Sequence, residues 1–277
     1  MSRKEQMDTI EEKLKNGIKE YFTSEKYSAL LKAIGKFHHY SFNNALLITS
    51  QCPHASYVTS YSTWKNNFNR IVRKGEKAIR IIAPCPYKTT NKKTGEEEDR
   101  LAFRAVSVFD ISQTIQIPET DEIPFKLPEL TGNVPDYDIL IRAVSKSTIM
   151  PVSYENIPGG AKGFYSPTEN RIVVQANMSP LQTLKTLIHE TAHARLHNPI
   201  AQKARKTDHE TKEIEAESIA FIVAYMLGLD TSDYSFEYIA RWEGKDDMKR
   251  LNASMTIIRD TANSIFDDIQ ANVNPAA

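Results

Sequence analysis

Long apolar runs and cysteines are scarce in this sequence of 277 residues. No stretch approaches the roughly 18 consecutive apolar residues of a transmembrane helix. The N-terminal segment MSRKEQMDTIEEKLKNG is charged and lacks the apolar core of a signal peptide. We therefore expect a cytoplasmic protein with no membrane partner. The two cysteines, Cys52 and Cys85, are too few for a disulfide framework or a cysteine-based zinc site, so we expect reduced thiols.

Glycine and proline are also modest in number, and the net charge is zero. The 10 glycines and 13 prolines exclude a collagen-like chain, and 40% apolar with 25% charged residues excludes a wholly disordered one. A chain of 277 residues is long enough for one large or two small domains. We expect a soluble globular protein.

The 35 basic and 35 acidic residues cancel over the whole chain but are unevenly distributed. Residues 1–110 hold 19 of the basic and 12 of the acidic residues, so this part is positive and the remainder equally negative. The excess is strongest over residues 60–93, where nine basic residues accompany a single acid, Glu76. Such a stretch is typical of a surface that binds a polyanion. The nine are Lys65, Arg70, Arg73, Lys74, Lys77, Arg80, Lys88, Lys92 and Lys93.

Two differently charged modules indicate two domains. Four prolines between residues 116 and 138 interrupt the periodic apolar pattern, which is typical of an extended linker. We therefore divide the chain into a first domain over 1–125, a linker over 126–136 and a second domain over 137–277. In the first domain, apolar spacing predicts helices near 10–22, 24–37 and 42–50. Apolar runs at 78–83 and 101–109 predict a hairpin with its turn near Gly95, so the expected fold class is α+β.

The most specific motif is LIHETAHARLH at 187–197, in which His189, Glu190 and His193 form the pattern H-E-x-x-H. Residues four apart lie on the same face of a helix, so both imidazoles can reach one metal ion while Glu190 acts as the general base beside it. Ser179 is suited to the N-cap of this helix, with Pro180 in its first turn. A short run, RIVVQ at 171–175, predicts a strand before it.

A catalytic zinc site takes three protein ligands and leaves one position open. The next predicted helix, EIEAESIAFIVAYMLGL, offers Glu213, Glu215 and Glu217. We choose Glu215 as the third ligand because it lies on the apolar face of that helix, where an acid needs a partner such as a metal. Glu213 and Glu217 are expected to be ordinary helix acids, and His197 and His209 to be solvated or capping. Zn²⁺ suits these donors, and Mn²⁺ or Co²⁺ is compatible with them.

Several segments resemble one known family over nearly the whole chain. YSFNNALLI at 40–48, SYSTWK at 60–65, RKGEKAIRIIAP at 73–84 and VFDISQT at 108–114 resemble the N-terminal single-stranded-DNA-binding domain of ArdC-type antirestriction proteins, which LtrC-like proteins of conjugative elements share. HETAHARLH, EIEAES and GLDTSDYSFEYIARW resemble the zincin-like metallopeptidase domain of that family, related to ImmA/IrrE-type peptidases. The resemblance implies a mobile-element protein that binds single-stranded DNA and helps incoming DNA escape restriction. It also implies a third metal ligand on the EIEAES helix, in agreement with Glu215.

Single-strand binding without sequence preference needs a basic groove for phosphates and aromatic faces on which bases stack. Residues 60–93 supply the charges, and aromatic side chains lie nearby in the sequence. No helix-turn-helix or zinc-finger spacing is present, so we do not expect sequence-specific reading of duplex DNA. The predicted DNA-binding residues are Tyr40, Phe42, Trp64, Lys65, Arg70, Arg73, Lys74, Lys77 and Arg80, with Tyr57 and Tyr61 as further candidates for stacking.

The expected reaction is metal-dependent hydrolysis of a peptide bond. His189, His193 and Glu215 would hold the ion, while Glu190 takes a proton from the attacking water and passes it to the leaving amine. Two alternatives remain open. The protein could be a DNA shield whose metal site is structural, or a soluble metallopeptidase whose basic first domain recruits a protein partner.

Overall fold

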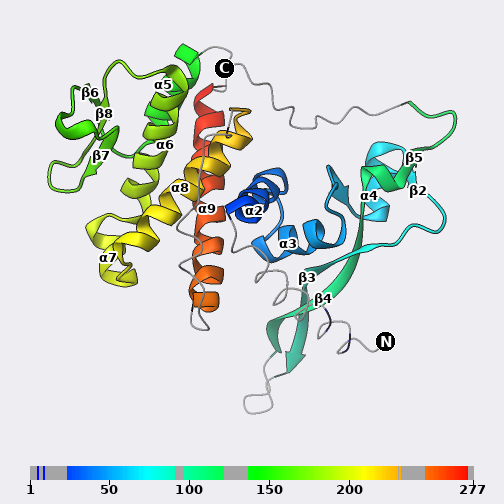
Figure 1. Cartoon of the computed structure of the whole chain (residues 1–277). Coiled ribbons are helices and arrows are strands. Elements are labelled where there is room, and N and C mark those ends of the chain that lie inside the picture. The colour runs from blue at the N-terminus through cyan, green and yellow to red at the C-terminus, as the bar shows by residue number, and fades with distance from the viewer. Residues whose placement is uncertain are drawn as a thin grey trace. The chain divides into compact units, whose positions relative to one another are not determined.

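The computed structural model describes residues 5, 9, 24–90, 97–121, 137–229, 231 and 247–273. The chain forms two compact units, one of residues 1–20 and 39–127 and the other of residues 21–38 and 128–277 (Figure 1). Each unit combines helices with strands, so the predicted two-domain α+β fold is confirmed. The predicted helix over 10–22, the turn near Gly95 and the linker over 126–136 lie outside the described residues.

Helix α2 (Ser24–Lys36) belongs to the second unit although most of the first unit follows it in sequence. The hydroxyl of Tyr27 on α2 lies 2.9 Å from Oγ of Ser218 on α8 (His209–Met226). A glycine permits this close approach, because a Cβ at Gly35 would lie 2.9 Å from the ring of Tyr225. The compact units therefore differ from a single cut near residue 125, which would separate α2 from α8.

The first unit is built on a long antiparallel hairpin. Strands β3 (Ile79–Thr90) and β4 (Glu97–Asp110) pair from Ile79 opposite Val108 to Thr90 opposite Glu97, which confirms the predicted hairpin and lengthens it. Helix α3 (Phe42–Gln51) packs on β3, where the side-chain amide of Asn44 bonds both backbone groups of Ile82. The other elements are β1 (Val58–Thr59), α4 (Tyr61–Phe68), β2 (Arg70–Val72), η1 (Ile111–Gln113) and β5 (Thr114–Gln116).

The second unit contains a three-stranded sheet with the order β6-β8-β7. Strand β6 (Val152–Glu155) is parallel to β8 (Arg171–Gln175), and β7 (Gly163–Ser166) is antiparallel to it. The predicted strand over 171–175 is confirmed. It is the central strand, with Ile172, Val173 and Val174 fully buried, so β7 is an edge of the sheet.

Helices complete the second unit. In the described residues these are α2, α5 (Tyr137–Ser147), α6 (Pro180–Leu196), α7 (Pro199–Arg205), α8 and α9 (Asp247–Val273), with η2 (Pro158–Gly160) between strands. Ser179 caps α6 as predicted, because its Oγ accepts a hydrogen bond from the backbone N–H of Gln182. Helix α6 packs against α8, and their contact brings side chains of the H-E-x-x-H motif close to acidic residues of α8. Within the described ranges, no helix is both long and apolar enough to cross a membrane.

Candidate metal centre

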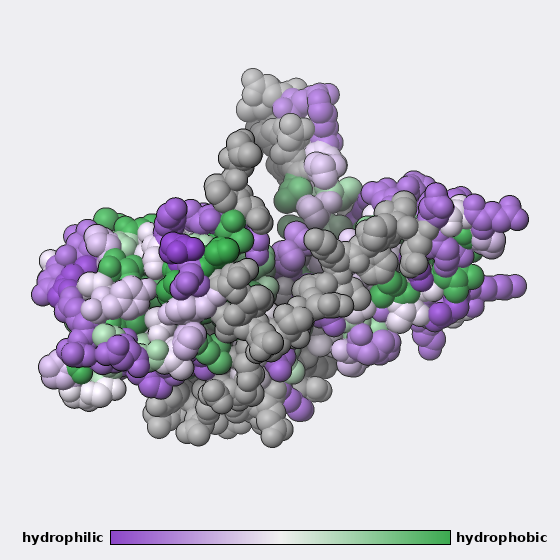
Figure 2. Space-filling model, turned by 90° about the horizontal axis from the view of Figure 1, so that it is seen from above, coloured by the Kyte–Doolittle hydropathy of each residue, from purple (hydrophilic) through white to green (hydrophobic). Residues whose placement is uncertain are grey.

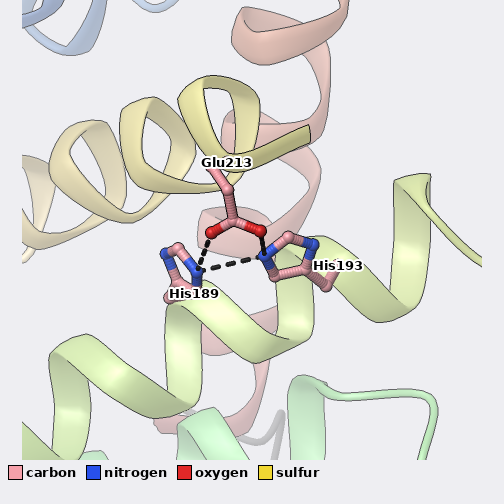
Figure 3. Close-up of side chains that lie close together, drawn as sticks. All are labelled: His189, His193 and Glu213. Carbon is pink, nitrogen blue, oxygen red and sulfur yellow. Dashed lines mark hydrogen bonds and ion pairs between the residues drawn. The ribbon is translucent and has the colours of Figure 1, made fainter. Parts of the chain in front are cut away.

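The H-E-x-x-H helix α6 directs two imidazoles toward one carboxylate on α8. The Nε2 atoms of His189 and His193 lie 3.1 Å apart. Glu213 approaches both, with Oε2 3.6 Å from Nε2 of His189 and Oε1 3.5 Å from Nε2 of His193. Figure 3 shows the three side chains pointing toward one another from the two helices. Their ligand atoms all lie within 4.8 Å of one another, which defines a candidate metal site of two nitrogens and one carboxylate.

The spacing of these donors fits a first-row divalent ion. Two ligands that bind zinc at about 2.0–2.1 Å with a tetrahedral angle between them are about 3.3 Å apart. The three distances of 3.1, 3.5 and 3.6 Å bracket that value. Two imidazoles and one carboxylate form a donor set that zinc, manganese and cobalt all accept. The residues present therefore fit a catalytic site with three protein ligands.

The electrostatic surroundings also favour a cation. Burial alone lowers the pKa of His189, but hydrogen bonds to Glu213 and Glu217 outweigh it and raise that pKa to about 10. Burial lowers the pKa of His193. Hydrogen bonds from both histidines hold the pKa of Glu213 well below its usual range. Glu213 is therefore an ionised carboxylate beside two nitrogen donors.

Glu190 lies next to the cluster without belonging to it. Its side chain is buried, and burial raises the pKa of its carboxyl group while His189 opposes that rise. The carboxylate of Glu213 raises the pKa further, and the backbone N–H of Tyr165 on β7 lowers it by donating a hydrogen bond. A buried carboxyl group with a raised pKa beside a metal site is suited to accept and return a proton.

The sequence-based choice of Glu215 as the third ligand is not matched by the structure, which brings Glu213 to the histidines. Glu215 is fully buried, as expected, but its carboxylate accepts hydrogen bonds from Arg205 at 2.5 and 3.0 Å and from Ser254 at 2.7 Å. Its partner is thus a guanidinium and not a metal. His197 is buried and not solvated, and it is the C-cap residue of α6, which matches the expected capping role; His209 is 89% exposed, as expected of a solvated side chain.

The candidate metal centre lies in a cleft of about 850 Å³ between β7, α6 and α8. Gly163 on β7 allows the edge strand to approach α6 closely, because a Cβ there would lie 2.5 Å from Cγ2 of Thr186 and 3.3 Å from Cγ of Glu190. The wall also carries three lysines that the sequence alone did not single out, Lys162, Lys185 and Lys212. The cleft therefore has a sheet edge on one side and the candidate metal ligands at its base.

The predicted DNA-binding residues of the first unit divide into buried and exposed groups. Trp64 is fully buried, its indole N–H donates to the carbonyl of Phe109 at 2.8 Å, and Phe42 is buried as well. The structure thus corrects the expectation that these two rings stack on bases. Tyr40 is half-buried, and its hydroxyl donates to the carbonyl of Val58. Tyr61 is 49% exposed.

The predicted basic residues also differ in their surroundings. Arg70 donates to Oγ1 of Thr114 at 2.8 Å, and Arg73 forms an ion pair with Glu76 at 2.7 Å, so both hold local structure. The described surface around β2 and β5 is largely hydrophilic, with small hydrophobic patches (Figure 2). In the part of the chain that the structure describes, no acidic residue pairs with the four remaining cations. These are the exposed Lys65, Lys74, Lys77 and Arg80.

Comparison with known proteins accords with this two-unit description. Residues 2–109 match the family model of the N-terminal domain of the anti-restriction factor ArdC. Residues 146–261 match the model of the IrrE N-terminal-like domain, a peptidase family. Fold and site thus define a two-domain α+β protein whose second domain is metallopeptidase-like. The first domain is that of the anti-restriction factor ArdC, and the chain is an ArdC-type protein with two domains.

Similar proteins extend over most of the chain. An uncharacterized protein of Bacillus anthracis, pXO2-81, is 28% identical over 98% of this chain and 52% of its own length, so the chain spans about half of that relative. The crystal structure of the antirestriction ArdC protein from plasmid R388 in its metal-free form has a TM-score of 0.58 at 21% identity, covering 84% of this chain and 85% of that one. The Mn(II)-bound form has a TM-score of 0.54 at 19% identity, with 85% of each chain covered. At these identities the likeness establishes a shared fold.

Proposed function

We propose that this chain is an antirestriction protein of a mobile element, which binds single-stranded DNA through its first unit and hydrolyses peptide bonds in its second. The observation that carries the peptidase part is the convergence of His189, His193 and Glu213 in an open cleft, with Glu190 left outside the ligand set. Structural zinc sites are closed by four protein ligands, whereas catalytic ones use three. The donor count and the cleft therefore favour a catalytic site.

Each residue of the cleft has a distinct task in this proposal. His189, His193 and Glu213 hold the divalent ion, for which Zn²⁺ and Mn²⁺ are the main candidates, and the bound ion supplies Lewis-acid chemistry. Glu190 removes a proton from the attacking water and delivers it to the leaving amine. Strand β7 offers its free edge to an extended peptide, which would add to the sheet as a further strand.

The test of this proposal is the Glu190→Gln protein. Its amide cannot accept a proton, so we expect cleavage of a fluorogenic casein substrate to be lost while about one metal ion per chain is retained. Asp138→Asn, which neutralises an exposed acid on α5, is the matched control and should cleave like the wild type. Unchanged cleavage by Glu190→Gln, or loss of its metal, would contradict the role assigned to Glu190.

The proposed DNA surface rests on exposed cations and an exposed ring. Tyr61 and Lys65 lie four residues apart on α4, so both side chains are on one side of that helix, where the ring would stack on a base and the ammonium would meet a phosphate. Lys74 and Lys77 flank a turn at Gly75, whose φ of +90° suits glycine. These groups combine the aromatic and cationic chemistry that single strands need.

The DNA test reverses charge at Lys74, Lys77 and Arg80 together and leaves Arg73 in its ion pair with Glu76. We expect the full-length Lys74→Glu/Lys77→Glu/Arg80→Glu protein to bind labelled single-stranded oligonucleotides more weakly than the wild type, whatever their base sequence. The slope of log affinity against log salt should also become shallower, because fewer phosphate contacts release counterions. The control reverses three exposed cations of the second unit, Arg142, Lys146 and Lys203. Equal affinity of the two triple variants would refute the assigned surface.

A further inference from the structure

The imidazoles of the candidate metal centre each have a second hydrogen-bonding atom, Nδ1, that faces away from the cluster. Nδ1 of His189 lies 3.1 Å from Oε2 of Glu217. Nδ1 of His193 lies 2.8 Å from Nδ1 of His197, whose Nε2 lies 3.0 Å from Oε2 of Glu215. Two separate connections thus lead from the histidines to carboxylates on α8.

The first connection fixes the tautomer of His189. A carboxylate oxygen accepts hydrogen bonds, so in this pair Nδ1 of the His189 ring is the donor. In the neutral imidazole that a metal ion would bind, Nδ1 keeps this proton and the lone pair lies on Nε2. That atom is the one that faces His193 and Glu213.

The second connection fixes the tautomer of His193 through one more ring. The buried carboxylate of Glu215 lies within hydrogen-bond distance of Arg205, Ser254 and Nε2 of His197, so it is the common acceptor of these three donors. A carboxylate oxygen only accepts, so Nε2 of His197 donates to Glu215, and a ring that holds this single proton accepts at Nδ1. Nδ1 of His197 then accepts and Nδ1 of His193 donates to it, so in the neutral ring that a metal ion would bind the lone pair of His193 lies on Nε2.

We propose that Glu217, and His197 together with Glu215, are positioning residues that hold both metal-binding histidines with their Nε2 atoms toward Glu213 and free to bind the metal ion. The inference rests on the proposed metal site and extends it. Glu213, Glu215 and Glu217 then have three different tasks within five residues of one helix. Glu213 joins the ligand set, Glu217 one turn later orients His189, and Glu215 on the buried side orients His193 through His197.

The decisive variant is Glu217→Ala, since the side chain of Glu217 is 36% exposed and its truncation leaves the core intact. Loss of an outer partner of a metal-binding histidine typically lowers metal affinity about 10–100-fold. We expect that loss for Zn²⁺ measured by competition with a chromophoric chelator, and partial recovery in Glu217→Gln, whose amide oxygen still accepts. Asp138→Ala, which removes an exposed acid on α5, should bind Zn²⁺ like the wild type.

A nitrogen-resolved measurement separates positioning from a merely structural role. Long-range ¹H–¹⁵N spectra of the Zn²⁺-loaded wild type should show Nε2 as the metal-binding atom and Nδ1 as the protonated atom in both histidines. Glu217→Ala should change the Nδ1 signal of His189 and leave that of His193 in place. His197→Leu should change His193 selectively, and His197→Gln should restore it in part.

The outcomes distinguish this inference from the proposed function. Zn²⁺ binding that survives in both His189→Ala and His193→Ala would refute the metal site itself. If those variants lose Zn²⁺ but Glu217→Ala keeps wild-type affinity and an unchanged His189 spectrum, the metal site stands and the positioning role is refuted. If Glu217→Ala instead lowers the melting temperature of the metal-free protein without lowering affinity, its role is structural and the proposal is overturned.

Discussion

A methyl group added at Gly163 should push the edge strand away from the metal-binding helix. A Cβ at this position would lie 2.5 Å from Cγ2 of Thr186, whereas carbon atoms in favourable contact are about 3.5–4.0 Å apart. Strand β7 or helix α6 must therefore give way by about 1 Å. Overpacking of this kind costs about 1–3 kcal/mol, so we expect Gly163→Ala to lower the free energy of unfolding by that amount.

A second substitution tests whether this one contact is responsible. Thr186→Ser removes Cγ2 but keeps the hydroxyl that accepts a hydrogen bond from Gln182. Alone it should cost about 1 kcal/mol, the worth of one buried methyl group. In the double variant the 2.5 Å contact no longer exists, and the nearest remaining atom to the new Cβ is the carbonyl oxygen of Val173 at 3.0 Å. The double variant should therefore lose less unfolding free energy than the two single variants lose together. We expect the difference to be at least about 1 kcal/mol.

Urea unfolding of the full-length wild type, both single variants and the double variant measures this coupling. The same four proteins should show a matching pattern in peptide cleavage. A displacement of about 1 Å near a catalytic group can cost about 100-fold in rate, and β7 donates the Tyr165 N–H to Glu190. Strictly additive free energies would show that the closeness of Gly163 to Thr186 does not limit the packing of β7.

Two further predictions concern the first unit. Tyr61→Ala should weaken binding of single-stranded DNA by about 1–3 kcal/mol without changing stability. Trp64→Ala should instead lower stability by about 3–5 kcal/mol, because its ring is fully buried. Oligonucleotide titration and thermal unfolding of both variants measure the two effects. The pKa of Asp110 lies below its ordinary value because hydrogen bonds from Ser56, Tyr57 and Ser112 outweigh burial, so its stabilising effect is complete above about pH 4 and declines as the pH falls further. Asp110→Asn should be less stable at neutral pH and flatter in a plot of stability against pH below 4, and a profile parallel to the wild type would contradict this assignment.

Local pattern was sufficient to predict most of the regular elements. The N-cap at Ser179, the strand at 171–175 and the hairpin pairing are confirmed because caps, β-branched runs and turns act over a few residues. Residue type alone could not show which aromatic side chains are exposed. Trp64 and Tyr61 are three residues apart on α4, and only the packing of that helix on Phe109 decides which of the two is buried.

The third candidate ligand could not be identified from the sequence. The rule that a buried acid needs a partner was correct for Glu215, yet the partner is Arg205, ten residues away and not predictable from periodicity. The carboxylate that meets both histidines is that of Glu213, whose side chain is 43% exposed and which the sequence alone presented as an ordinary acid near the start of a helix. A catalytic metal must be reachable by substrate, so its ligands lie at the cleft and not on the most buried face of a helix.

This distinction can be tested with two matched variants on α8. Glu213→Gln replaces a half-exposed ligand, so it should abolish tight metal binding while the metal-free protein keeps its stability. Glu215→Gln leaves the Arg205 guanidinium, 23% exposed, beside a neutral amide, and breaking such a pair should cost about 3 kcal/mol of stability. Its metal affinity should fall less than that of Glu213→Gln, because only the orientation of His193 is affected. Isothermal titration with Zn²⁺ and thermal unfolding of the metal-free proteins measure the two effects, and the reverse ranking of affinities would restore Glu215 as the ligand and remove Glu213.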